Sequence, residues 1–260
     1  MLIVVWSIAL KSKLPLVIPK KKWGQNFLRN RGAVDKIVNA IEPQPGEVIL
    51  EIGPGEGVLT EKLVELGEVT AIEIDPHLAA RLRQKFGDII VNADALEVPL
   101  PSRPFRAVGN LPYNVGTPIL RRVIADPNFR RAVFMLQKEV ADRLVAKPRD
   151  EQYGFLTLYR ELFASARILM KLDPGSFHPA PKVRSAVVVL DPDRKPFASD
   201  AFIDLISAAF RMRRKKLVNN LTTYPREDVL TALERANIDE GTRAEELSLD
   251  DFARLFNSLR

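Results

Sequence analysis

The sequence of 260 residues contains no cysteine and only two histidines, His77 and His178. Disulfides, thiol nucleophiles and cysteine-ligated zinc are therefore excluded, and we expect no metal site. No stretch reaches the ~20 apolar residues that cross a bilayer, and the mostly apolar residues 1–10 lack the basic start of a secretory signal. We expect a cytoplasmic protein without membrane contact, in which residues 1–19 form a loose extension.

What is abundant is positive charge on an otherwise ordinary globular composition. Hydrophobic residues make up 46% of the chain and charged residues 28%, and the net charge is +6. The length suffices for one large or two modest domains with a proper core. A basic surface favours polyanionic partners, although net charge alone is a weak signal.

Short apolar runs alternate with helical patterns through the first two thirds of the chain. Each run has the β-branched and aromatic content of a buried strand, and they cover residues 47–52, 69–74, 88–91, 105–108 and 131–136. This alternation predicts an α/β fold with a Rossmann-like, doubly wound, mostly parallel sheet. In such sheets the ligand binds beyond the carboxyl ends of the strands.

Helix signals separate these strands. Asn30 is a candidate N-cap for a helix over 31–41, and Asp75 followed by Pro76 starts another. A third helix is expected over 58–66. Ser248 and Asp251 form a candidate capping box for the last helix.

A glycine-rich turn, Gly-Pro-Gly-Glu-Gly over residues 53–57, follows the first strand. Glycine lets the backbone reach positive φ and lets a ligand approach closely. Its third glycine comes one residue too early for a dinucleotide fingerprint, and the acidic Glu51 lies two residues before Gly53. A carboxylate disfavours a diphosphate and favours a cation, which indicates S-adenosylmethionine. The alternative is a purely structural turn.

Other strand ends supply further polar groups. Glu73 lies about twenty residues beyond the first glycine, where a carboxylate accepts hydrogen bonds from ribose hydroxyls. Asp94, with Ala95 and Leu96 behind it, is placed to accept from an adenine amino group, unless it forms a simple polar turn. We therefore expect Gly53, Glu73, Asp94 and Asn110 to meet at one edge of the sheet.

The sequence Asn-Leu-Pro-Tyr at residues 110–113 ends the fourth strand. Pro112 has no amide hydrogen and holds Leu111 extended, so the strand stops there. An amide side chain, free carbonyls and the flat ring of Tyr113 suit the grip of a flat, nitrogen-rich ring. The alternative is a strand-to-loop turn with a buried tyrosine.

The chain changes character after Arg149. A proline-rich loop over residues 173–183 contains Phe177, which offers either a second aromatic face for a base or a core side chain. From residue 200 the pattern is helical, and residues 211–216 place five cations within six positions, which on a helix suit a phosphate backbone. The lysines at 20–22 are a solvated tail or part of a ligand-contacting arm.

Several motifs together resemble the small-subunit ribosomal RNA adenine dimethyltransferases (KsgA type), which are related to the Erm methyltransferases. The matching segments are 24–28, 51–57, 73–75, 92–95, 110–113, 137–139, 177–185 and 210–221. The combination of Gly-Gln-Asn-Phe-Leu, Asn-Leu-Pro-Tyr and Phe-x-Pro-x-Pro-Lys-Val-x-Ser is specific to this group. The family often has a third proline where this chain has Ala180.

The resemblance implies dimethylation, from S-adenosylmethionine, of the exocyclic amine of two adjacent adenosines near the 3′ end of small-subunit rRNA. The partner would be a pre-ribosomal small subunit, with a role in its biogenesis, and we expect a monomer. The alternatives are an Erm-type enzyme of large-subunit rRNA and an assembly factor with little catalysis. The expected domains are a catalytic domain over 20–192 and a smaller helical RNA-binding domain over 193–260.

Residue roles follow from the motifs and the resemblance together. The expected catalytic residues are Asn110, Leu111, Pro112, Tyr113 and Phe177. The expected cofactor residues are Gln25, Asn26, Leu28, Glu51, Gly53, Gly55, Glu73, Ile74, Asp94, Ala95 and Asn110. The expected RNA-binding residues are Lys20, Lys21, Lys22, Arg211, Arg213, Arg214, Lys215 and Lys216.

Overall fold

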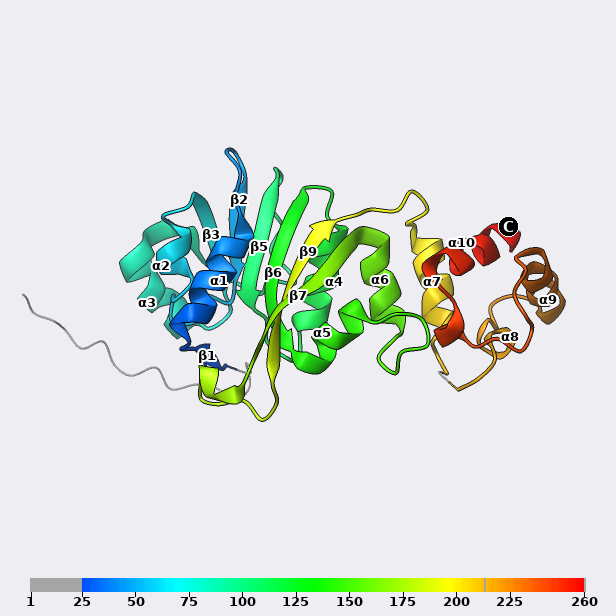
Figure 1. Cartoon of the computed structure of the whole chain (residues 1–260). Coiled ribbons are helices and arrows are strands. Elements are labelled where there is room, and N and C mark those ends of the chain that lie inside the picture. The colour runs from blue at the N-terminus through cyan, green and yellow to red at the C-terminus, as the bar shows by residue number, and fades with distance from the viewer. Residues whose placement is uncertain (1–24, 213, 260) are drawn as a thin grey trace, which may run out of the picture.

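The computed structural model describes residues 25–212 and 214–259, which are built around a seven-stranded sheet in the order β4-β3-β2-β5-β6-β9-β7 (Figure 1). Five neighbouring strands are parallel, and β9 runs antiparallel to both β6 and β7. The predicted mostly parallel, doubly wound sheet is confirmed. The strands are β2 (Val48–Ile52), β3 (Glu68–Glu73), β4 (Ile90–Asn92), β5 (Phe105–Asn110), β6 (Phe129–Gln137), β7 (Ala164–Leu172) and β9 (Ser185–Pro192).

Helices cover both faces of this sheet. One face packs on α1 (Arg31–Ile41), α2 (Thr60–Leu63) and α3 (Pro76–Phe86), and the other on α4 (Gly116–Ala125), α5 (Lys138–Val145) and α6 (Phe155–Phe163). Successive strand residues point to opposite faces, so Ala107 joins one core and Val108 the other, both fully buried. The two cores fix the sheet, and with it the positions of the strand ends.

Three helix starts follow the sequence signals. The side chain of Asn30 accepts from Ala33 N–H at 3.0 Å, and that of Asp75 accepts from His77 N–H at 3.0 Å. Ser248 and Asp251 cap each other's backbone at the start of α10 (Leu249–Ser258). These three predicted caps are confirmed.

Two predicted elements have wrong bounds. The helix expected over 58–66 is only α2, Thr60–Leu63, because turns over 55–59, which contain the left-handed Gly57 (φ 83°), precede it and turns over 64–66 follow it. The strand expected over 88–91 begins as the 3-10 turn η2 (Gly87–Ile89), and β4 starts only at Ile90.

The chain after β9 forms a helical region beside the sheet, at the right of Figure 1. It consists of α7 (Asp200–Ala209), α8 (Leu217–Asn220), α9 (Arg226–Arg235), the 3-10 turn η4 (Ala244–Glu246) and α10. Its apolar core is continuous with the core under α4 to α6. Tyr153 bridges the two parts, because its hydroxyl donates to the Leu247 carbonyl at 2.7 Å and its ring meets Phe210 edge-on. The boundary at 192/193 stays a prediction, and residues 1–19 lie outside the described residues.

The described residues of the basic run, 211–212 and 214–216, are not helical, so that part of the prediction is wrong. These residues form turns and bends between α7 and α8, and we call them the basic turn. The buried Asn220 explains the break: its side-chain amide donates to the carbonyls of Ala209 (2.6 Å) and Met212 (3.1 Å). The Ala209 carbonyl would otherwise accept the next helical N–H, so the helix ends there.

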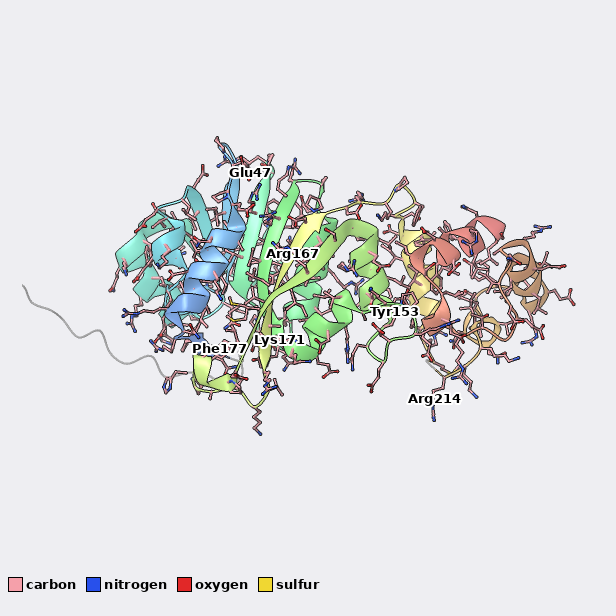
Figure 2. The ribbon with its side chains drawn as sticks, viewed as in Figure 1. Glu47, Tyr153, Arg167, Lys171, Phe177 and Arg214 are labelled. Carbon is pink, nitrogen blue, oxygen red and sulfur yellow. The ribbon has the colours of Figure 1, made fainter. Side chains whose placement is uncertain are left out.

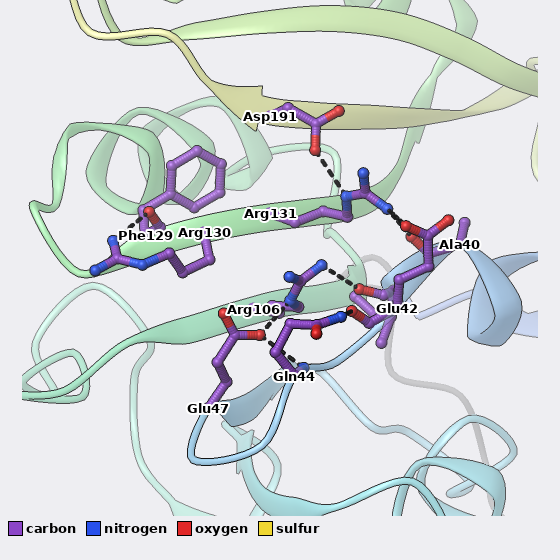
Figure 3. Close-up of polar contacts among 10 residues, drawn as sticks. Ala40, Glu42, Gln44, Glu47, Arg106, Phe129, Arg130, Arg131 and Asp191 are labelled. Atoms are coloured by element: carbon purple, nitrogen blue, oxygen red, sulfur yellow. Dashed lines mark hydrogen bonds and ion pairs between the residues drawn. The ribbon is translucent and has the colours of Figure 1, made fainter.

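Ion pairs tie the elements together at the amino ends of the strands (Figure 3). Arg106 of β5 pairs with Glu47, and Arg131 of β6 pairs with Glu42 and, at 2.7 Å, with Asp191. Burial opposes ionisation of Glu47, but the Arg106 guanidinium outweighs it and holds the pKa of that carboxyl below its usual value. This cluster is structural, since ligands of such sheets bind at the opposite edge.

Candidate active site

A cleft opens at the carboxyl ends of β2, β3 and β5, the lower edge of the sheet in Figure 1. It brings together most of the residues expected to bind the cofactor or the acceptor base. Its lining consists of Gln25, Asn26, Phe27, Gly53, Gly55, Glu73, Ile74, Leu78, Asn110, Leu111, Pro112 and Tyr113. Phe27 and Leu78 are additions, and no polar motif in the sequence pointed to them.

The glycine turn forms one wall of the cleft. Gly53, Gly55 and Gly57 all have positive φ, at 71°, 61° and 83°, which L side chains rarely adopt. A Cβ on Gly55 would lie 3.0 Å from the Phe27 ring. The turn therefore depends on glycine both for its backbone conformation and for its contact with the segment that covers it.

Glu73 ends β3 on the neighbouring wall and is only 4% exposed. Its carboxylate accepts the N–H groups of Asp75 at 2.9 Å and of Gly55 at 3.0 Å. Burial raises the pKa of Glu73, and these two backbone bonds oppose that rise. Each carboxylate oxygen has a further lone pair, so the group can still accept from ligand hydroxyls.

The cleft suits a cationic nucleoside better than a dinucleotide. Among the described residues that line it, the only acidic or basic side chain is that of Glu73, and a carboxylate repels a diphosphate and attracts a cation. Ile74 is 41% exposed at the cleft and offers an apolar surface to a flat ring. Left-handed glycines, a buried carboxylate and an apolar wall fit S-adenosylmethionine.

Glu51 does not line the cleft. It lies beneath the glycine turn, 1% exposed, and its carboxylate accepts from the Thr60 hydroxyl at 2.7 Å. Burial raises its pKa to about 7, with a further rise from the nearby charge of Glu73. A direct contact between Glu51 and the cofactor stays a prediction.

Three other expected cofactor residues also lie away from the described lining. Leu28 is 6% exposed within the apolar core. Asp94 accepts from the Leu96 N–H at 2.8 Å, which is the polar turn considered as its alternative. Ala95 belongs to the same turn, and its carbonyl accepts from Arg122. Their contacts with a cofactor stay predictions.

Asn110 ends β5 with its amide held in one orientation. Its side-chain N–H donates to the Asn26 carbonyl at 2.7 Å, which leaves the amide oxygen as the group that can accept. The Pro112 carbonyl already accepts from Val115 (3.2 Å) and Gly116 (2.7 Å). No hydrogen bond to the Leu111 carbonyl is found within the described part of the chain. Of the two carbonyls considered from the sequence, that of Leu111 is the available acceptor.

The residue before Asn110, Gly109, is one that sequence reasoning missed. A Cβ at Gly109 would lie 2.2 Å from the Ile52 carbonyl oxygen on the neighbouring strand. Only glycine therefore allows β5 to approach β2 closely at this point. The available signal was a glycine directly after the strand predicted over 105–108.

Tyr113 is fixed at its far end. Its hydroxyl lies 3.2 Å from the Ser185 hydroxyl, and Ser185 is buried at the start of β9. The half-buried ring thus stands at the mouth of the cleft. The alternative expectation, a fully buried tyrosine in a strand-to-loop turn, is therefore wrong.

Phe177 is a correction, because the structure favours the core alternative over a stacking face. Its side chain is 5% exposed in the core under α1, and it does not line the cleft. It belongs to β8 (Phe177–His178), which pairs antiparallel with β1 (Phe27–Leu28). Arg29 N–H extends this pairing with a bond to the Ser176 carbonyl at 2.8 Å. The β1–β8 pair thus joins the segment after residue 24 to the proline-rich loop.

A second, mostly apolar groove adjoins the cleft on the outer side of Tyr113. The two share Gln25, Asn26 and Tyr113, so they are continuous. The rest of its lining is Gln137, His178, Pro179, Ala180, Pro181, Lys182 and Val183. None of these was expected to touch a ligand, although they fall within the quoted motifs.

The structure describes four of the eight predicted RNA-binding residues. Arg211, Arg214, Lys215 and Lys216 are exposed on the basic turn. In Figure 2 the labelled Arg214 and Phe177 both lie toward the lower side of the molecule, the side of the cleft. Lys20, Lys21, Lys22 and Arg213 lie outside the described residues.

Two kinds of feature are not found among the described residues. Between residues 25 and 259, position 213 apart, no helix combines the length and apolarity that a membrane crossing requires. In the same residues no three His, Asp or Glu side chains converge as a metal site would need.

Comparison with known proteins identifies close relatives. The family model for ribosomal RNA adenine dimethylase matches residues 19–260. The ribosomal RNA small subunit methyltransferase A of Methylococcus capsulatus is 43% identical over 257 residues, covering 93% of this chain and 98% of the relative. Its counterpart in Hahella chejuensis is 41% identical over 254 residues, covering 91% of each.

Solved structures agree with this. A dimethyladenosine transferase from Plasmodium falciparum superposes with a TM-score of 0.78 at 28% identity, covering 90% of this chain and 98% of that one. The 23S rRNA methyltransferase ErmE gives a TM-score of 0.68 at 31% identity, covering 90% and 99%.

Proposed function

The chain belongs to the ribosomal RNA adenine dimethylase family, and from this premise we propose that it dimethylates two adjacent adenosines near the 3′ end of small-subunit rRNA. The hydrogen bond of the Asn110 amide carries the proposal, because its N–H side donates to the Asn26 carbonyl and its oxygen is the group left to accept from an amine. The resemblance inferred from the motifs is confirmed, and the chain is a methyltransferase of this family.

Small-subunit RNA is favoured over large-subunit RNA by degree of similarity. The relatives named for the small subunit share 41% and 43% of their residues with this chain, whereas ErmE, named for 23S rRNA, shares 31%. The pre-ribosomal small subunit as partner, a cytoplasmic location and a monomeric state are parts of the same proposal.

S-adenosylmethionine fits the cleft and would supply an electrophilic methyl group. We assign Glu73 to its ribose hydroxyls, because this buried carboxylate ends β3 inside the cleft. Gly53 and Gly55 would let it approach the backbone, and Ile74 would contact its adenine. The carboxylate of Glu73 also complements a positive charge nearby.

The acceptor amine needs positioning more than a base. Its lone pair is delocalised into the adenine ring, so it is a weak nucleophile. The amide oxygen of Asn110 and the carbonyl of Leu111 would accept its two hydrogens and aim the lone pair along the cleft. Fixed dipoles of this kind lower a barrier without reorganising during the reaction. The hydrogen bond to Asn26 keeps the amide from turning its donor side toward the amine.

Tyr113 would hold the adenine ring by its face. Its hydroxyl contact with Ser185 fixes the plane of the phenol at the mouth of the cleft. Stacking of a base on such a ring contributes ~1–3 kcal/mol. The base has to leave its helix or stacked strand to enter, as enzymes that modify bases require. The exposed basic turn would hold the surrounding RNA backbone.

The test is methyl transfer from labelled S-adenosylmethionine to unmethylated small subunits, to unmethylated large-subunit RNA, and to a protein-only control. Label in the small subunit, recovered as dimethyladenosine, is the expected result. Label in large-subunit RNA alone would show instead the Erm-type activity on large-subunit rRNA. Absence of label, with binding to the small subunit intact, would leave an assembly factor without catalysis.

A further inference from the structure

The groove outside Tyr113 has an apolar floor that the transfer chemistry does not use. Pro179, Ala180 and Val183 line it and are exposed, and Val183 retains 44% of its surface. Exposed apolar side chains gathered beside an active site mark a contact surface for a ligand. The floor is therefore suited to a flat, weakly polar group.

The position of the groove identifies its occupant. It is continuous with the cleft through Gln25, Asn26 and Tyr113, so an acceptor base entering the cleft passes along it. Of the two nucleotides that flank this base in the RNA chain, the one on the groove side would then lie in the groove. A nucleobase has two apolar faces that pack on such side chains whatever its identity.

A free cation stands beside the floor. Lys182 is exposed, and no ion pair or hydrogen bond of its ammonium is found among residues 25–212 and 214–259. Arg184, two residues on, differs because it pairs with Asp173 at 3.0 Å. Lys182 is thus available to the phosphate that links two nucleotides.

We propose that Pro179, Ala180 and Val183 form a subsite for the base beside the target adenosine, with Lys182 on the linking phosphate. The proposal rests on the function above, in which two adjacent adenosines are modified. Each of them occupies the cleft in turn, and the groove, which lies on one side of the cleft, holds the other adenosine in one of the two rounds. When the groove-side adenosine is the first to be modified, the base in the subsite is already dimethylated. Dimethylation removes both N–H donors and adds two methyl groups, and an apolar floor accepts that base without leaving a donor unpaired.

The test compares unmethylated small subunits with small subunits reconstituted with RNA that carries dimethyladenosine at the first or, in a separate preparation, at the second of the two positions, and the premodified preparation that places the modified base on the groove side is the one that reports on the subsite. Val183→Asn should slow transfer to the premodified subunits about fivefold more than transfer to the unmethylated ones, because it replaces an apolar contact by a polar group. Val183→Leu, of similar size but apolar, should keep the wild-type ratio of the two rates. Val64→Asn, at an equally exposed valine outside the groove (41%), controls for a polar surface change.

Equal slowing on both substrates in Val183→Asn would overturn the base subsite. For the phosphate contact, Lys182→Ala should weaken binding of both subunits alike and reduce the slope of log affinity against log salt by about 1. An unchanged slope would overturn that contact. If the wild-type protein binds S-adenosylmethionine but methylates neither subunit, the proposed function fails and the subsite with it.

Discussion

Gly109 offers the sharpest test of how the fold positions Asn110, the residue proposed to hold the acceptor amine. A Cβ at this position would lie 2.2 Å from the Ile52 carbonyl oxygen, and 3.1 Å from the Ile52 carbonyl carbon. Both obstacles are backbone atoms of a central strand, so no side-chain rotation relieves the contact. Reaching an ordinary van der Waals separation of 3.4 Å requires the two strands to move apart by about 1.2 Å.

The cost of Gly109→Ala follows from that displacement. Overpacking of this kind destabilises by ~1–3 kcal/mol. Asn110 is the next residue and would shift with the strand, and a misplacement of about 1 Å can lower turnover ~10²-fold. We therefore expect a variant that folds, that is less stable by roughly 2 kcal/mol, and that transfers methyl groups about 100 times more slowly.

Denaturant unfolding and initial rates of methyl transfer measure the two effects. Gly175→Ala is the matched control, because no atom lies within 4 Å of its added Cβ and its backbone is not left-handed. That control should stay within about 0.5 kcal/mol of wild type. A Gly109→Ala protein with wild-type stability and turnover would refute the reasoning that strand contact at this glycine sets the position of Asn110.

Three further predictions concern single side chains. Asn110→Asp replaces the donor to the Asn26 carbonyl by a carboxylate oxygen, so turnover should fall at least ~100-fold at pH 7 and recover partly as acid restores a donating proton; a pH–rate profile parallel to wild type would contradict this. Because the pKa of Glu51 is raised to about 7, its contribution to stability is complete below the unfolded value of 4.5 and is lost as pH rises through 7. Glu51→Gln, which cannot ionise, should therefore have a free energy of unfolding roughly 3 kcal/mol above that of wild type at pH 8, measured by denaturant unfolding, and this difference should vanish near pH 4.5. Tyr153→Phe removes the buried bond to the Leu247 carbonyl and should destabilise by ~1–2 kcal/mol in thermal unfolding, whereas an unchanged midpoint would show that this link between the sheet and the C-terminal helices is not needed.

The local features of the fold were predictable because neighbouring residues encode them. Asn30 and Asp75 cap helices through bonds that span only three and two residues. The glycine turn over 53–57 adopts positive φ for reasons internal to glycine. The helix expected over the basic run did not form, because the side chain of Asn220, eleven residues after Ala209, bonds the Ala209 carbonyl that would have continued the helix.

The site was predictable in its members but not in its geometry. Parallel strands deliver their carboxyl ends to one edge, so Gly53, Glu73 and Asn110 meet there whatever the details of packing. Phe177 could be assigned either to the base or to the core from sequence. Its burial follows from pairing with Leu28, a partner that no local pattern identifies.

The sequence by itself determined the alternation of strands and helices, the caps, the glycine turn and the family, because each resides in a short run of residues. Tertiary structure alone decided which way the Asn110 amide points, since the Asn26 carbonyl that orients it lies 84 residues away. The same holds for the 72-residue contact of Tyr113 with Ser185, which fixes the phenol ring. Contacts between segments far apart in the sequence form only when the sheet has folded. The orientations of Asn110 and Tyr113 therefore depend on the tertiary fold and not on their motif alone.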